Sequence, residues 1–136
     1  MEVLSVDAQC YALLFADKII EEKNGKKGII GVFSNFNFPK FPAGVPEWFI
    51  YVAFSNITGK HTFSLNLVHD DDQLVILPIG GEFEIPEGSP GTEVVFPVRG
   101  LVFPKTGNYT LTFNIDGNQI AARILSVQEI IPEGSR

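Results

Sequence analysis

The fold is decided by residues 103–124, which read FPKTGNYTLTFNIDGNQIAARI. From Tyr109 to Asp116, apolar and polar side chains alternate, a pattern typical of a β-strand with one buried face. A second alternating run extends from Gln119 to Ile124. The dipeptide Asp116-Gly117 between the two runs tolerates the positive φ angles of a tight turn. The stretch therefore predicts a β-hairpin.

Upstream of this hairpin, the chain divides into further short apolar runs with turn residues between them. Residues 62–67 alternate in the same way. The pair Gly80-Gly81 is expected to end one apolar run and to separate it from the next. Residues 86–91 hold two prolines and two glycines and predict a loop. Within the apolar segment 94–103, Pro97 indicates an edge strand or a bulge. Short strands at this spacing indicate an all-β sandwich or barrel.

The N-terminal segment admits two interpretations. Apolar residues at 12, 13, 15, 16, 19 and 20 fit helical spacing, and Asp7 could cap such a helix. Against this, Asn24-Gly25 lies between two apolar runs, which is a strong signal for a hairpin. We favour the hairpin over the helix for residues 8–20.

A tyrosine placed just after a turn decides between a sandwich and a barrel. Gly107 and Tyr109 follow Pro104 in a spacing that resembles the tyrosine corner of immunoglobulin-like sandwiches, in which the tyrosine hydroxyl bonds to upstream backbone. We therefore expect Tyr109 to be buried and bonded to backbone near residues 105–107. The residue two places further on is Leu111 and not Cys, which excludes the disulfide-bearing subtypes.

Several landmarks together resemble one family of small bacterial proteins of unknown function. These are the strand 12–20, Gly25-Lys26, residues 30–33, Phe41-Pro42, and the ending that runs from Phe103-Pro104 through Gly107 and Tyr109 to Asp116-Gly117. The resemblance covers about residues 12–127 and implies an immunoglobulin-like antiparallel β-sandwich of eight or nine strands. It implies no activity. Tyr109, Gly107 and Gly117 are the expected structural residues, in one domain over residues 1–131 with a frayed tail over 132–136.

Composition excludes several classes of protein. The chain has 136 residues and is 45% hydrophobic, enough for a full core, so disorder is excluded. Its net charge of −6 argues against nucleic acid and anionic membranes as partners. Cys10 is the single cysteine, and the acidic start without a long apolar run is unlike a secretory signal. A cytoplasmic location is the simplest expectation.

No combination of residues in the sequence predicts catalysis. Asp70-Asp71-Asp72 could offer oxygen ligands to Ca²⁺, but without the spacing of an EF-hand it reads as a charged hairpin tip. His61 and His69 are too far apart on one strand to share a metal ion. Glu82 and Glu84 share a face that is expected to be solvated. We therefore assign no catalytic, cofactor or metal residues, and expect no enzyme.

Aromatic residues gather in the second quarter of the chain and suggest a contact surface. The possible interaction residues are Phe36, Phe38, Phe41, Trp48, Phe49 and Tyr51. The strand 48–55 is apolar on both faces, so its second face needs a cover, either residues 36–41 or another subunit. We expect a non-catalytic interaction module that binds a second copy as a homodimer, or another protein. The alternative is a small-ligand module, for example for carbohydrate, in which Trp48 or Tyr51 stacks on a ring.

Overall fold

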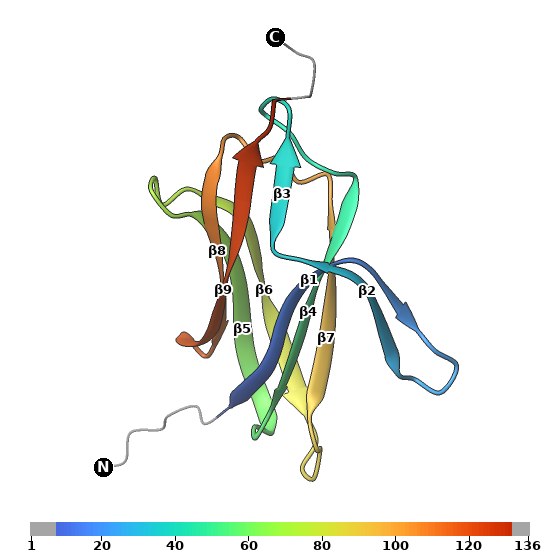
Figure 1. The fold of residues 1–136 in the computed structure, drawn as a ribbon. Helices are drawn as coiled ribbons and strands as arrows, with labels where there is room; N and C mark the ends of the chain where they lie inside the picture. The colour runs from blue at the N-terminus through green and yellow to red at the C-terminus, as the bar shows by residue number, and fades with distance from the viewer. Residues whose placement is uncertain (1–7, 132–136) are drawn as a thin grey trace.

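Two β-sheets pack face to face in the computed structural model, which describes residues 8–131 (Figure 1). The strands are β1 (Gln9–Glu21), β2 (Lys27–Phe33), β3 (Asn35–Phe38), β4 (Glu47–Ser55), β5 (Gly59–His69), β6 (Val75–Ile85), β7 (Thr92–Arg99), β8 (Gly107–Ile115) and β9 (Asn118–Glu129). The tail expected over 132–136 and the helix cap expected at Asp7 lie outside the described residues. Within residues 8–131 no helix is long and apolar enough to cross a membrane.

The first sheet has the strand order β2-β1-β4-β7, and the second has the order β3-β9-β8-β5-β6. All neighbours pair antiparallel except β3 and β9, which are parallel. The chain changes sheets at Ser34, the one residue between β2 and β3. The orders β1-β4-β7 and β9-β8-β5 correspond to strands A-B-E and G-F-C of an immunoglobulin sandwich. The all-β, immunoglobulin-like architecture that the sequence predicts is thus confirmed.

Both predicted hairpins are present. Asp116 and Gly117 join β8 to β9 with φ angles of 51° and 81°, the positive values of a type I′ turn. At the N-terminus β1 and β2 form an antiparallel hairpin, so the helical alternative is wrong. The expected edge position of Pro97 is also confirmed, since β7 ends the first sheet.

The expected break at Gly80-Gly81 is wrong, because β6 runs through it without interruption. Gly81 lies opposite Phe63 on β5, and a Cβ at Gly81 would stand 3.0 Å from the Phe63 ring. The glycine therefore gives room to a neighbouring aromatic ring within the sheet and does not end the strand.

The aromatic segment packs in the core, which corrects most of the predicted interaction surface. Phe38 and Trp48 are buried, and Phe36 and Phe41 are half-buried against the same core cluster. The rings of Phe36 and Phe103 lie 5.8 and 6.5 Å from that of Trp48. Because β3 joins the second sheet beside β9, its aromatic side chains point between the sheets. Trp48 therefore cannot stack on a ligand.

Tyr109 forms a tyrosine corner at the start of β8. Its side chain is fully buried, and its hydroxyl donates a hydrogen bond to the carbonyl oxygen of Lys105 at 2.6 Å. This is the bond expected from the sequence. The ring of buried His69 packs edge-on at 4.9 Å, and its Nε2 donates to the carbonyl of Thr106 at 2.9 Å. The corner thus holds the connection from β7 to β8 against the end of β5.

Replacing Tyr109 with phenylalanine should keep the ring packing and leave the Lys105 carbonyl without its buried donor. We expect the free energy of unfolding to fall by about 1–3 kcal/mol. Urea denaturation followed by tryptophan fluorescence measures this loss. A Tyr109→Phe protein as stable as the parent would show that the hydrogen bond does not support the corner.

Replacing Gly107 with alanine should destabilise the corner more than a positive φ angle alone can explain. A Cβ at Gly107 would lie 2.4 Å from Nε2 of His69, and the φ angle is 135°. Gly100 is a matched control, because its φ angle is also positive (67°) but its Cβ would meet no atom within 4 Å. We expect Gly100→Ala to cost about 1 kcal/mol and Gly107→Ala a further 1–3 kcal/mol or so. Equal losses for the two variants would contradict the proposed contact with His69.

Candidate functional site

The side of the first sheet that faces away from the second sheet is largely apolar. Trp48, Ile50 and Val52 of β4 point into the core, so the alternate residues of β4 and of its neighbours point outward. We call this surface the outer face. Its residues are Ala12, Leu14, Ala16, Lys18 and Ile20 of β1, Ile30 and Val32 of β2, Phe49, Tyr51 and Ala53 of β4, and Glu93, Val95 and Pro97 of β7.

Phe49 and Tyr51 are the two predicted surface residues that lie on the outer face. Residues 36–41 do not cover them, because β3 belongs to the second sheet. Phe49 is half-buried, whereas Tyr51 is buried, with 7% of its surface exposed. The Tyr51 hydroxyl donates a hydrogen bond to the Glu93 carboxylate. Burial, together with this carboxylate, raises the pKa of Tyr51 well above the usual range, so the phenol stays protonated.

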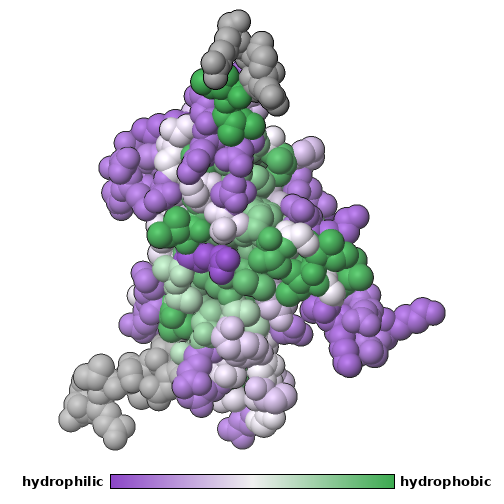
Figure 2. All heavy atoms as spheres, in the orientation of Figure 1, coloured by the Kyte–Doolittle hydropathy of each residue, from purple (hydrophilic) through white to green (hydrophobic). Residues whose placement is uncertain are grey.

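The outer face continues onto a two-stranded arm. Pairing of β1 with β4 stops at Ala16, whereas pairing of β1 with β2 continues to Glu21 and Lys27. The hairpin therefore leaves the body of the sandwich, and we call residues 17–31 the arm (Figure 1). Apolar atoms gather over its base and polar atoms at its tip (Figure 2). A two-stranded ribbon is marginally stable alone in water, so an apolar arm of this kind gains from a partner.

Exposed apolar side chains on the arm, and Val32 beside it, enlarge the outer face. Ile20 is 45% exposed, Ile30 51% and Val32 52%. Charged groups lie on the same face. Lys18 is opposite Ile30. The ion pair between Arg99 and Glu47, with an N–O distance of 2.5 Å, stands at the margin. An apolar centre with a polar rim is the usual anatomy of a protein interface.

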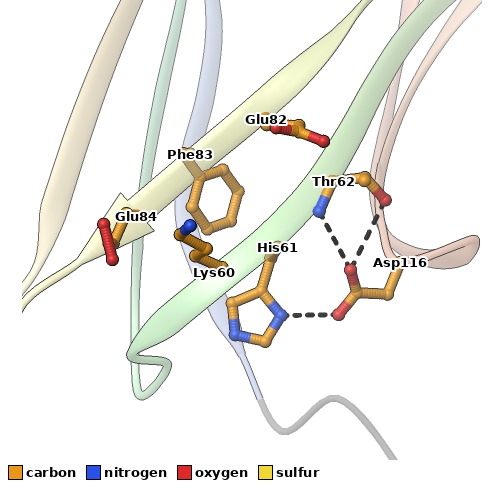
Figure 3. A pocket seen from close by; sticks show the side chains of 7 residues that line it. All are labelled: Lys60, His61, Thr62, Glu82, Phe83, Glu84 and Asp116. Atoms are coloured by element: carbon orange, nitrogen blue, oxygen red, sulfur yellow. Dashed lines mark hydrogen bonds and ion pairs between the residues drawn. The ribbon is translucent and has the colours of Figure 1, made fainter.

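A second candidate is an open pocket of about 380 Å³ at the paired ends of β5 and β6, beside the β8–β9 turn. We call it the polar pocket. Its lining residues are Lys60, His61, Thr62, Glu82, Phe83, Glu84 and Asp116 (Figure 3). Figure 3 shows His61 of β5 and Asp116 of the turn pointing toward each other.

His61 is held between two oxygen acceptors. Its Nδ1 lies 2.5 Å from Oδ2 of Asp116, and its Nε2 lies 2.7 Å from the carbonyl oxygen of Thr58. Both nitrogens can donate at once only in the imidazolium form. The hydrogen bond to Asp116 accordingly raises the pKa of His61, and the bond from His61 lowers the pKa of Asp116.

The same carboxylate fastens the turn to β5. Oδ1 of Asp116 accepts a hydrogen bond from the Thr62 backbone N–H at 3.0 Å, and the Asp116 N–H donates to the Thr62 carbonyl at 2.9 Å. In the imidazolium form both ring nitrogens of His61 donate to fixed acceptors, and no lone pair faces a substrate or a metal ion. The pair therefore acts as a clamp on the β8–β9 turn.

The acidic triplet is engaged in bonds within the protein. Asp70 accepts a hydrogen bond from the Thr110 hydroxyl at 2.6 Å, and Asp72 pairs with Lys105. The triplet occupies the turn between β5 and β6, as expected for a hairpin tip. Over residues 8–131, no three His, Cys, Asp or Glu side chains come together in a way that could hold a metal ion.

Sequence reasoning missed the pairing of His61 with Asp116. Asp116 was explained by the needs of its turn, and the two residues are 55 positions apart. One usable signal was present. If residues 62–67 and 109–116 are neighbouring antiparallel strands, the start of the first strand, next to His61, lies beside the end of the second, at Asp116.

Replacing Asp116 with asparagine should lower the pKa of His61 toward its ordinary value of 6.5. Asparagine retains the acceptor for Thr62 and tolerates the positive φ angle, so the turn should persist. NMR titration of the imidazole Cε1–H measures the pKa. Asp71→Asn removes an equal charge from a distant exposed turn and is the control. An unchanged His61 pKa in Asp116→Asn would contradict the pairing.

The stability that the pair contributes should depend on pH in two directions. The raised pKa of His61 stabilises the fold fully below 6.5, and this contribution is lost as the pH rises through the folded-state pKa. The lowered pKa of Asp116 stabilises it fully above 3.8, and this contribution is lost as the pH falls through the folded-state pKa. Urea denaturation should therefore separate the parent most clearly from Asp116→Asn between pH 3.8 and 6.5.

Solved structures superimpose on most of this chain at low sequence identity. An alkylpurine DNA glycosylase of Pseudomonas fluorescens, bound to DNA containing an abasic site analog, superimposes with a TM-score of 0.52 at 4% identity, over 90% of this chain and 30% of the glycosylase. An immunoglobulin-like protein of Pseudomonas aeruginosa gives a TM-score of 0.48 at 11% identity, over 90% and 97% of the two chains. A β-glucosidase of Listeria innocua in complex with isofagomine gives 0.48 at 10% identity, over 93% of this chain and 16% of the enzyme.

The chain spans less than a third of the glycosylase and a smaller part of the glucosidase, and at these identities the likeness concerns the fold alone. No curated protein matches the sequence. A family model described as a family of unknown function, DUF6941, matches residues 11–128, which include both sheets and the tyrosine corner. The chain therefore belongs to the DUF6941 family.

Proposed function

We propose that this protein is a non-catalytic interaction module that self-associates through the outer face of its first sheet. One observation carries the proposal: the segment that could have covered this face, residues 36–41, packs into the core with the second sheet. An antiparallel sheet that is apolar on both sides needs a layer on each. Within residues 8–131, the chain supplies a layer on the inner side only.

A second copy is the occupant that the charges favour. Glu93 lies near one end of β7 and Arg99 at the other, both on the outward side of that strand. A twofold axis in the plane of the interface, perpendicular to the strands, places β7 of one copy antiparallel to β7 of the other. Glu93 of one copy then lies toward Arg99 of the other. In this arrangement the carboxylate of one copy approaches the guanidinium of the other, while each keeps its partner within its own chain, Tyr51 for Glu93 and Glu47 for Arg99.

The non-catalytic part of the proposal is supported by the polar pocket. Its single histidine is engaged at both ring nitrogens, so His61 is not free to act as a general base. We also propose a cytoplasmic location, supported by the single cysteine, which allows no disulfide within the chain.

Placing a charge on the arm should break self-association. We expect the parent to sediment as a dimer at concentrations of about 1–100 µM. We expect Ile30→Asp to weaken the dimer at least about tenfold, because burying the new carboxylate removes its hydration even with Lys18 opposite it on β1. Sedimentation velocity over a dilution series measures this change. Circular dichroism establishes whether each variant keeps its β-sheet spectrum.

Ile124→Asp is the matched control. Ile124 is 53% exposed, close to the 51% of Ile30, but lies on β9 in the second sheet. It should leave the dimer unchanged. A parent that is monomeric throughout the dilution series, or equal weakening by the two variants, would contradict self-association through the outer face.

A further inference from the structure

The two long sides of the sandwich are closed differently. On the side of β1 and β9, Nη1 of Arg123 donates a hydrogen bond to the Leu13 carbonyl at 3.4 Å, and its guanidinium lies 5.8 Å from the centre of the Phe15 ring. On the opposite side stand β6 and β7, the edge strands of the two sheets, which do not pair with each other (Figure 1). A cavity of about 130 Å³ lies between the sheets on this side.

The cavity has a buried part and a part that reaches solvent. Val52 and Phe54 of β4 and Phe113 of β8 form the buried part. The side chains that border it and are only half-buried are Phe63, Phe83, Val94 and Phe96. All four pack against the core cluster, so they point between the sheets and are nevertheless partly exposed. The cavity therefore opens to solvent where β6 and β7 face each other.

Glu82 also borders the cavity, but its carboxylate faces away from it. Along β6 it precedes Phe83, whose ring points into the core and lies 5.5 Å from that of Phe54. Because successive side chains of a strand point to opposite faces, Glu82 points to the outward face of the second sheet, beside Thr62 of β5. Among the residues that line the cavity, every side chain that points into it is thus a phenylalanine or a valine.

The volume and the lining together determine which kind of molecule fits. An apolar protein cavity of about 150 Å³ is known to hold benzene, so a cavity of about 130 Å³ has room for one six-membered ring. Without a ligand, the lining side chains lack contacts that an apolar molecule of this size would restore. A charged group in the cavity would lose its hydration and gain no ionised partner there, so the lining selects against it.

We infer that the cavity between β6 and β7 binds a small, uncharged, apolar molecule of about the size of a benzene ring. The ligand enters between Phe83 on β6 and Val94 on β7 and packs against Phe54 and Phe113. The cavity is on the inner side of the first sheet, whereas self-association uses the outer face. The inference therefore stands independently of the proposed function.

Three probes that share one ring test the inference: benzene, benzylamine and benzoate. Titration with benzene, followed by methyl and aromatic NMR, should give saturable shifts at Phe63, Phe83 and Val94 with a Kd of about 1 mM. We expect the cationic amine and the anionic carboxylate to bind at least about tenfold more weakly. A charged probe that binds as tightly as benzene, shifts centred on the outer face, or no saturation by benzene at millimolar concentrations would overturn the inference.

Two neighbouring valines of β7 provide a matched pair of variants. Val94 points into the cavity and Val95 to the outer face, and both are half-buried. Val94→Phe fills the cavity and should abolish benzene binding, whereas Val95→Phe should leave the Kd unchanged. Circular dichroism establishes whether each variant keeps its β-sheet spectrum. Equal loss of benzene affinity in the two variants would contradict the site.

A variant that enlarges the cavity tests the same site without adding bulk to the core. In Val94→Ala, we expect the affinity for p-xylene relative to that for benzene to rise at least about threefold, because the larger cavity accommodates the added methyl groups. The same NMR titrations measure this ratio. An unchanged ratio in Val94→Ala would show that benzene binds elsewhere.

Discussion

The hydrogen bond from the Tyr109 hydroxyl to the Lys105 carbonyl fixes the place where the chain crosses from the first sheet to the second. The crossing segment also carries Phe103, whose ring packs 5.2 Å from that of Tyr109 and whose backbone bonds to Ala43 on the opposite strand connection. Because β8 pairs with both β5 and β9, its position determines the register of most of the second sheet. The aromatic core around Trp48 packs against this crossing segment through the ring of Phe103.

The two sheets treat their outward sides differently, and this contrast organises the surface. On the second sheet, threonine and asparagine alternate with the core residues of β8, as water requires. On the first sheet, the equivalent positions hold Leu14, Phe49 and Val95, and the apolar surface continues onto the arm. A cavity also lies between the two sheets on the side where the edge strands β6 and β7 face each other without pairing. The arm and the cavity thus both follow from where strand pairing ends.

Local patterns predicted most of the fold, and long-range neighbours account for what they missed. The Asp116-Gly117 hairpin, the edge strand with Pro97 and the corner at Tyr109 depend on residues close in sequence. Gly80-Gly81 was misread because the ring that needs the space, Phe63, belongs to another strand. Periodicity showed that Trp48 to Phe54 has two apolar faces but could not assign residues 36–41 to one of them. The hydrogen-bond partners of His61 and the cavity between β6 and β7 could be recognised only from the packing of the two sheets.

Gly31 on β2 hinders edge-to-edge association between copies of this protein, whichever other surface the copies use to bind each other. The edge strand β2 contains no proline, whereas the edge strands β6 and β7 do. Its apolar run Ile29-Ile30 would therefore favour pairing with strands of further copies, which leads to a fibre. At Gly31 the φ angle is +71°, and the carboxylate of Asp17 fills the space where a Cβ would be. This interrupts the extended edge in its middle. Lys23 and Lys26 add charge at its end, next to the ion pair of Lys27 with Glu21. Growth along the edge is therefore resisted, although the outer face beside it is apolar.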